Sequence, residues 1–104
     1  MNDAVVESFA GRLIAFAAER DLPAIWGSGF APRQGALMSY SSNYFALGQR
    51  AAHYVDRILK GTSPSDLPIE QTTVFTLCIN LKTAKALGLT VPPELLATAD
   101  EVIE

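Results

Sequence analysis

Three short apolar segments, separated by stretches with helical spacing, constrain this chain more than any other feature. They cover residues 24–26, 36–38 and 73–79, and the last is rich in β-branched and aromatic residues. Apolar strands that alternate with helices predict an α/β fold with a mostly parallel sheet. Three strands are few for a doubly wound sheet, so we expect incomplete lobes.

The helical segments are marked by their spacing and by their end signals. A first helix is predicted from Asp3, its N-cap, to about residue 20, and a second over residues 44–59. Ser42 or Asn43 can cap the second helix, and Gly61 follows it where a left-handed residue is favoured. Two shorter helices are predicted, one over residues 81–87 between Asn80 and Gly88, and one that begins at Pro93. The final residues fit either a helix end or a strand.

Composition and charge exclude several classes of protein. The chain has 104 residues, which is at most one domain, and a net charge of -3. That balance argues against a nucleic-acid partner, because no basic surplus exists to neutralise phosphates. No run of 18 apolar residues occurs, as a membrane span would need. The first 20 residues lack a basic start and carry acidic residues among the apolar ones, so they predict a helix rather than a signal peptide.

Residues for catalysis or metal binding are scarce. His53 is the only histidine, on the polar face of the second predicted helix, and Cys78, the only cysteine, sits in an apolar run. The Gly27–Gly29 stretch follows a strand but lacks the rest of a phosphate-binding fingerprint. We therefore expect no enzyme, no metal site and no cofactor.

A polar run between the second strand and the second helix is the best candidate for a site. It holds Ser39, Tyr40, Ser41, Ser42, Asn43 and Tyr44. Ligands of open α/β sheets bind at the carboxyl ends of strands, and free N–H groups at a helix start suit a carboxylate. Hydroxyl and amide groups could hold a polar head, and the tyrosines could pack on an apolar body. The same run also fits a simple capping cluster with no ligand. Trp26 and Phe30 could complete a pocket or could serve core and loop packing.

One long segment carries a family resemblance. The pattern "DRILKG", "DLPIEQ", "F.L.INLKTAKALGLTVP", from Asp56 to Pro92, together with "LPAIWG" and "GALMSY", resembles the C-terminal part of the ABC-transporter substrate-binding proteins related to the tryptophan-binding TrpX-like family. The resemblance covers nearly the whole chain but only about the last third of a typical member.

The resemblance implies a partial type I periplasmic-binding fold, a three-layer α/β architecture with two lobes around a cleft. Residues 1–35 and 73–104 would belong to the C-terminal lobe. Residues 36–72 would hold a hinge crossing and a helix of the N-terminal lobe. Such proteins bind a small solute, present it to an ABC permease and catalyse nothing. They are periplasmic or membrane-anchored.

The leading interpretation is therefore a solute-binding component of an ABC importer, or its C-terminal fragment. The residues assigned to the ligand are Ser39, Tyr40, Ser41, Asn43, Tyr44 and Phe30, and the solute is a small molecule such as an amino acid. Apolar edges and helix stripes left open by incomplete lobes predict a homodimer. The alternative is a small α/β interaction module that self-associates and binds no solute.

Overall fold

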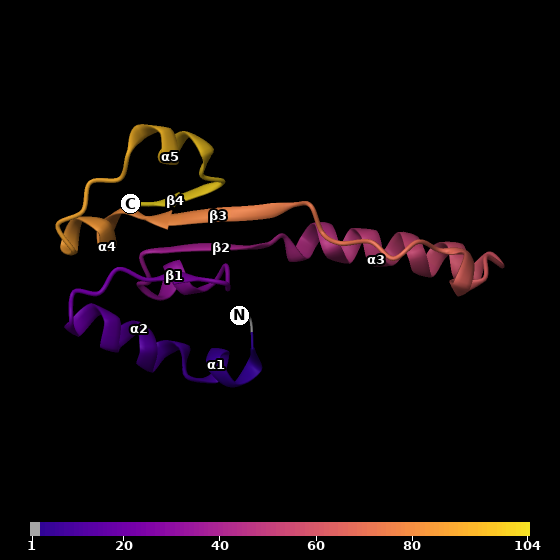
Figure 1. Ribbon diagram of the computed structural model, residues 1–104, viewed down its shortest axis with the longest axis horizontal. Helices are drawn as coiled ribbons and strands as arrows, with labels where there is room; N and C mark the ends of the chain where they lie inside the picture. Colours follow the sequence, from indigo (N-terminus) through magenta and orange to yellow (C-terminus); the bar gives the residue numbers. More distant parts are fainter. Residues whose placement is uncertain (1–2) are drawn as a thin grey trace. The chain divides into compact units, whose positions relative to one another are not determined.

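A computed structural model describes residues 3–104 and confirms a mixed α/β fold (Figure 1). Its sheet has four strands in the order β1-β2-β3-β4, and both β1 with β2 and β3 with β4 pair in parallel. In Figure 1, β3 runs back along β2 in the opposite direction, so the sheet is mostly parallel. The elements are α1 (Ala4–Ser8), α2 (Ala10–Glu19), β1 (Ile25–Trp26), the 3-10 turn η1 (Ala31–Gln34), β2 (Met38–Ser42), α3 (Tyr44–Leu59), the 3-10 turn η2 (Pro64–Asp66), β3 (Phe75–Asn80), α4 (Leu81–Ala86), α5 (Pro93–Thr98) and β4 (Glu101–Ile103).

The chain divides into two compact units. Unit 1 contains residues 1–41 and Thr76–Glu104, and unit 2 contains Ser42–Phe75. Unit 1 holds nearly the whole sheet together with α1, α2, α4 and α5. Unit 2 holds α3, η2 and the extended segment that follows them.

Unit 1 has a hydrophobic core. Ile79 and Cys78 of β3 and Ala84 of α4 are at most 1% exposed. A cluster of Ile14, Ala31 and Ala36 packs with Trp26 and joins α2 to the sheet. Cys78 is thus the buried core residue that the sequence predicts, and burial raises the pKa of its thiol.

Unit 2 is held together without a core. No residue of Ser42–Phe75 is buried, and part of the apolar stripe of α3, namely Val55, Ile58 and Leu59, is exposed. Phe45 is 77% exposed, Leu59 82% and Ile69 fully exposed. The extended segment is tied to α3 by polar contacts. The Tyr54 hydroxyl donates to the Pro68 carbonyl, and Arg50 forms an ion pair with Glu70.

Helix ends follow the predicted signals closely. The Asp3, Asn43 and Asn80 side chains each accept a hydrogen bond from a backbone N–H of the helix that follows. Gly61 (φ 106°) and Gly88 (φ 72°) are left-handed residues just beyond α3 and α4. Leu89 N–H donates to the Ala84 carbonyl and so completes a Schellman motif at the end of α4.

Two predicted boundaries are wrong. The first predicted helix is broken at Phe9, because the Ser8 hydroxyl donates to the Val5 carbonyl and Phe9 N–H turns to Val6 instead. The predicted strand over residues 36–38 begins only at Met38 and runs to Ser42. Ala36 instead closes the η1 turn by donating to the Ala31 carbonyl.

The fourth strand resolves the ambiguity at the C-terminal residues. Glu101–Ile103 form β4, which pairs with β3 from Cys78↔Glu101 to Asn80↔Ile103. The sequence alone does not separate this strand from a helix end, because three residues are too few to show a period.

Candidate functional site

The β2 strand divides the predicted polar run between its two faces. Side chains alternate along a strand, so Ser39 and Ser41 lie on one face and are 0% and 7% exposed. Tyr40 lies on the other face and is 53% exposed. The first four residues of the polar run, Ser39 to Ser42, are therefore part of the sheet rather than a loop beyond a strand end, and Ser39 and Ser41 do not share a face with Tyr40.

A segment over residues 27–35, which we name the strap, lies against β2. A Cβ placed on Gly29 would be 3.4 Å from Ser41 Oγ, so the strap backbone packs directly on that hydroxyl. Ser28, Ala31 and Pro32 are buried, whereas Phe30 is 65% exposed. The strap thus places Phe30 at the surface, close in sequence to the point of contact with Ser41.

Asn43 and Tyr44 belong to unit 2. Asn43 Oδ1 accepts from Ala46 N–H at 2.9 Å and so caps α3 as predicted. Asn43 N–H donates to the Val74 carbonyl. Tyr44 begins α3 and is 54% exposed. The boundary between the two units therefore falls inside the predicted site, with Ser39, Tyr40, Ser41 and Phe30 on the side of unit 1.

Two buried polar atoms lack hydrogen-bond partners within residues 3–104. They are Ser39 Oγ and Trp26 Nε1, on neighbouring strands that pair Trp26 with Ser39. Leaving a buried polar atom without a partner costs about 1–3 kcal/mol. Ser39 is thus a desolvated hydroxyl whose hydrogen-bonding capacity the described residues do not use.

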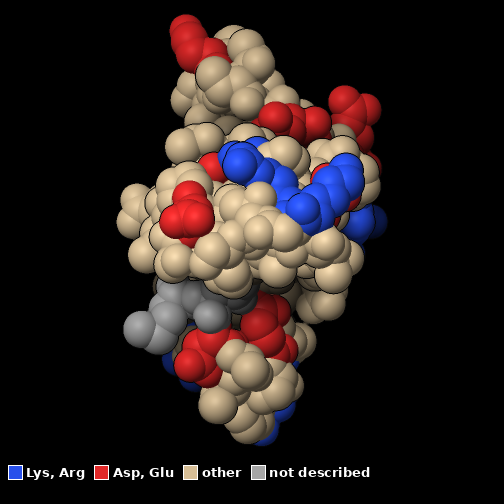
Figure 2. All heavy atoms as spheres, turned by 90° about the vertical axis from the view of Figure 1, so that its right-hand side faces the viewer, with Lys and Arg blue, Asp and Glu red and all other residues tan. Residues whose placement is uncertain are grey.

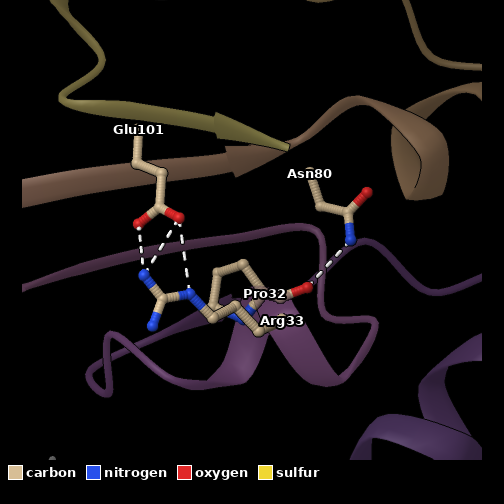
Figure 3. A network of polar contacts seen from close by, with 4 residues as sticks. All are labelled: Pro32, Arg33, Asn80 and Glu101. Carbon is tan, nitrogen blue, oxygen red and sulfur yellow. Dashed lines mark hydrogen bonds and ion pairs between the residues drawn. The ribbon is translucent and has the colours of Figure 1, made fainter. Parts of the chain in front are cut away.

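Side chains from β3, α4 and β4 hold the strap in place. Figure 3 shows those from β3 and β4. Asn80 Nδ2 donates to the Pro32 carbonyl at 2.8 Å, and Arg33 pairs with Glu101 of β4 at 3.1 Å (Figure 3). Thr83 Oγ1 donates to the Gly35 carbonyl at 2.9 Å. The sequence shows Asn80 as a helix cap, but it gives no local signal for these contacts, which join residues 48 to 68 positions apart.

Charged side chains are spread over the surface of the described residues. Among the described residues no group of three or more His, Cys, Asp or Glu side chains could hold a metal ion. On the face in Figure 2, basic and acidic side chains are interspersed with uncharged surface. An ion pair on unit 2 shifts the pKa of a carboxyl group, because hydrogen bonds from Arg50 lower the pKa of Glu70 to about 2.

The described residues form a cavity in each unit. A cavity of about 610 Å³ in unit 1 lies among α2, the strap and α4, and one of about 530 Å³ in unit 2 lies between α3 and residues 70–74. Neither is lined by a residue that the sequence assigns to the ligand. No helix in residues 3–104 has the length and apolar character needed to cross a membrane.

Comparisons with known proteins agree on one class. A conserved domain protein from Vibrio cholerae superposes with a TM-score of 0.86 at 30% identity, over 96% of this chain and 34% of that one. An ABC domain from Streptococcus pneumoniae in complex with L-Trp gives 0.85 at 26%, over 97% and 35%. The ligand-free, open structure of an adhesive substrate-binding protein from Clostridium difficile gives 0.67 at 28%, over 98% and 34%. No curated protein matches.

The fold is that of a periplasmic-binding-like protein. This chain spans about a third of the length of the solved structures that it matches. The sequence profile of the ABC transporter substrate binding proteins matches residues 1–103. The chain belongs to that family. Its members are not enzymes, which agrees with the expectation from the sequence.

Proposed function

We propose that this chain is a solute-binding part of an ABC importer and that its solute is a small molecule with a carboxylate, such as an amino acid. The observation that carries the proposal is the match of the family profile over residues 1–103. The similar Streptococcus pneumoniae domain, which holds L-Trp, supports an amino acid as solute. The solute would bind in an interlobe cleft, and a permease would receive it from a periplasmic or membrane-anchored position.

The proposed lobe assignment follows the family. Residues 1–35 and 73–104 would be parts of the C-terminal lobe, and residues 36–72 a hinge crossing with a helix of the N-terminal lobe. The division into units at Ser41 and Phe75 supports crossings near those positions. Closure on the solute would then be a hinge motion that shifts a population toward the bound state.

The proposed ligand residues divide into two groups by exposure. Phe30, Tyr40 and Tyr44 each expose half or more of their surface and can pack on an apolar or aromatic body. Ser39, Ser41 and Asn43 supply hydroxyl and amide groups for a polar head. The buried Ser39 hydroxyl lacks a hydrogen-bond partner among the described residues. A head group that reached it would supply that partner and remove the cost of leaving the hydroxyl unpaired.

A thermal shift across a panel of the twenty amino acids tests solute binding. A ligand that binds only the native state at 100 times its dissociation constant adds about 2.7 kcal/mol to the free energy of unfolding. The proposal predicts a rise in melting temperature with a few related amino acids. A flat response to the whole panel, with a cooperative melt, would count against it.

We also propose that a second copy of this chain covers α3. The supporting observation is that no residue of Ser42–Phe75 is buried although α3 carries an apolar stripe. Sedimentation equilibrium tests this directly. The proposal predicts a dimer at micromolar concentration. A monomer at all concentrations would contradict it, and a stable dimer that binds no amino acid would favour the interaction module instead.

A further inference from the structure

The strap has no helix or strand apart from the short η1 turn, and side chains from distant elements tie it in place. It begins with Gly27, Ser28 and Gly29, and glycine gives a chain more freedom than any other residue. Short backbone bonds close η1 internally, from Ala31 N–H to the Ser28 carbonyl and from Arg33 N–H to the Phe30 carbonyl. These local bonds shape the turn but do not fix it to the sheet.

Three side chains from later in the chain fix the strap in place. They are Asn80 at the end of β3, Thr83 in α4 and Glu101 in β4, and they bind Pro32, Gly35 and Arg33 in turn. The strap leaves β1 and reaches partners on β3 and β4, as the two contacts in Figure 3 show. Gly29 meanwhile rests on Ser41 of β2.

Asn80 uses both ends of its amide. Its Oδ1 accepts from Thr83 N–H at 3.0 Å and caps α4, while its Nδ2 donates to the Pro32 carbonyl at 2.8 Å. Asn80 is 6% exposed, so no water competes freely for either bond. An aspartate at this position would keep the cap and lose the donor, because a carboxylate only accepts. One substitution thus separates the two roles.

We propose that Asn80, supported by Thr83 and the Arg33–Glu101 ion pair, is a positioning residue that holds the strap so that Phe30 is pre-organised for the solute. The inference rests on the proposed function, in which Phe30 contacts the solute. A contact on a loop that is already ordered costs less entropy on binding than one on a loop that must be ordered by the ligand. Asn80 itself touches no solute in this account.

The test measures L-tryptophan affinity by calorimetry and backbone amide exchange in the strap, on the 104-residue chain well below its melting temperature. Asn80→Asp is expected to weaken affinity on the order of five- to tenfold, as expected for the loss of one buried hydrogen bond. Exchange at Ala31, Arg33 and Gly35 speeds up, while exchange at Leu87, which follows α4 and donates to the Thr83 carbonyl, stays as in the wild type. A purely structural role would lower the melting temperature and leave the affinity of the folded protein unchanged.

Milder variants keep the test decisive if Asn80→Asp does not fold. Thr83→Val removes one tether with little change in shape, and Glu101→Gln weakens another; each is expected to lower affinity about twofold, since neutral or exposed contacts contribute less. Glu70→Gln is the matched control, because it disrupts a similar exposed Arg–Glu pair in unit 2 and should leave affinity and strap exchange unchanged.

The outcomes separate two failures. If the wild type binds L-tryptophan and Asn80→Asp binds it equally well, the positioning role is overturned and solute binding stands. If strap exchange does not change in Asn80→Asp, the tether is overturned. If the wild type binds neither L-tryptophan nor any other amino acid, the proposed function fails and the positioning role fails with it.

Discussion

Unit 1 and unit 2 come from one short chain but differ in what stabilises them. Unit 1 buries side chains from α2, the strap, β3 and α4, and its irregular strap is tied by three long-range side-chain contacts. Unit 2 buries none of its residues and relies on helix caps, an ion pair and one tyrosine hydrogen bond. Most of the stability of a helix in a protein comes from packing of its apolar face, and α3 packs against no buried residue of its own unit.

The largest expected effect comes from a matched pair of isoleucines. Ile79→Ala removes a side chain that is 0% exposed in β3 and should cost about 2–5 kcal/mol of unfolding free energy. Ile58→Ala on α3, where the side chain is 40% exposed, should cost less than about 1 kcal/mol in the monomer. Chemical denaturation measures both. Equal costs would mean that α3 is packed as tightly as β3, and the contrast between the units would fail.

A charge on the open face of α3 tests what covers it. Val55 is 54% exposed on the apolar stripe, so Val55→Lys should disrupt a dimer that buries this face and raise its dissociation constant at least tenfold. Gln49→Lys adds the same charge on the polar face of the same helix and is the control. Sedimentation of the two variants compares them. A dimer that tolerates Val55→Lys as well as Gln49→Lys would place the interface elsewhere.

Two glycines give a smaller, matched comparison. Gly88 and Gly61 both have positive φ after a helix, in unit 1 and unit 2 respectively. Alanine at either position is strained by about 1 kcal/mol. Gly88→Ala should lower the global free energy of unfolding by that amount, whereas Gly61→Ala should mainly fray the end of α3. A denaturant melt measures the global cost of each variant, and amide exchange along α3 measures local fraying. A full global cost from Gly61→Ala would show that unit 2 unfolds together with unit 1.

The smallest effect concerns pH. Arg50 lowers the pKa of Glu70 from 4.5 to about 2. The ion pair therefore stabilises the folded chain fully above pH 4.5, and its contribution is lost as the pH falls toward 2. The wild type should lose slightly more stability than Glu70→Gln over that range, in melts at matched ionic strength. Identical pH profiles would show that this exposed pair contributes nothing measurable.

The sequence predicts well what depends on neighbours in the chain. The bounds of α3, its Asn43 cap and its Gly61 end all follow from residues within one helical turn. The apolar spacing of the first helix does not show the break at Phe9, where the Ser8 side chain bonds to the backbone. Local apolar character does not show the start of β2 either, because that strand begins where Met38 pairs with Ile25 of β1.

The site illustrates the same limit. The polar run itself is visible in the sequence, but the extension of β2 to Ser42 is not, and the period of that strand puts Ser39 and Ser41 on one face and Tyr40 on the other. The strap contacts of Asn80, Thr83 and Glu101 depend on the sheet order, which brings together residues more than 45 positions apart. The alternation of strands and helices predicts the α/β class, and the family resemblance adds the periplasmic-binding fold because it covers nearly the whole chain rather than one motif.

The central claim is that the chain binds an amino acid through residues around β2 and the start of α3. Titration of the isotope-labelled chain with L-tryptophan, followed by backbone amide NMR, tests it most directly. The account predicts saturable shifts at Phe30, at Ser39 to Ser41 and at Asn43 and Tyr44, with α5 unaffected. Saturable shifts confined to other elements, or none with L-tryptophan and the other nineteen amino acids, would contradict it.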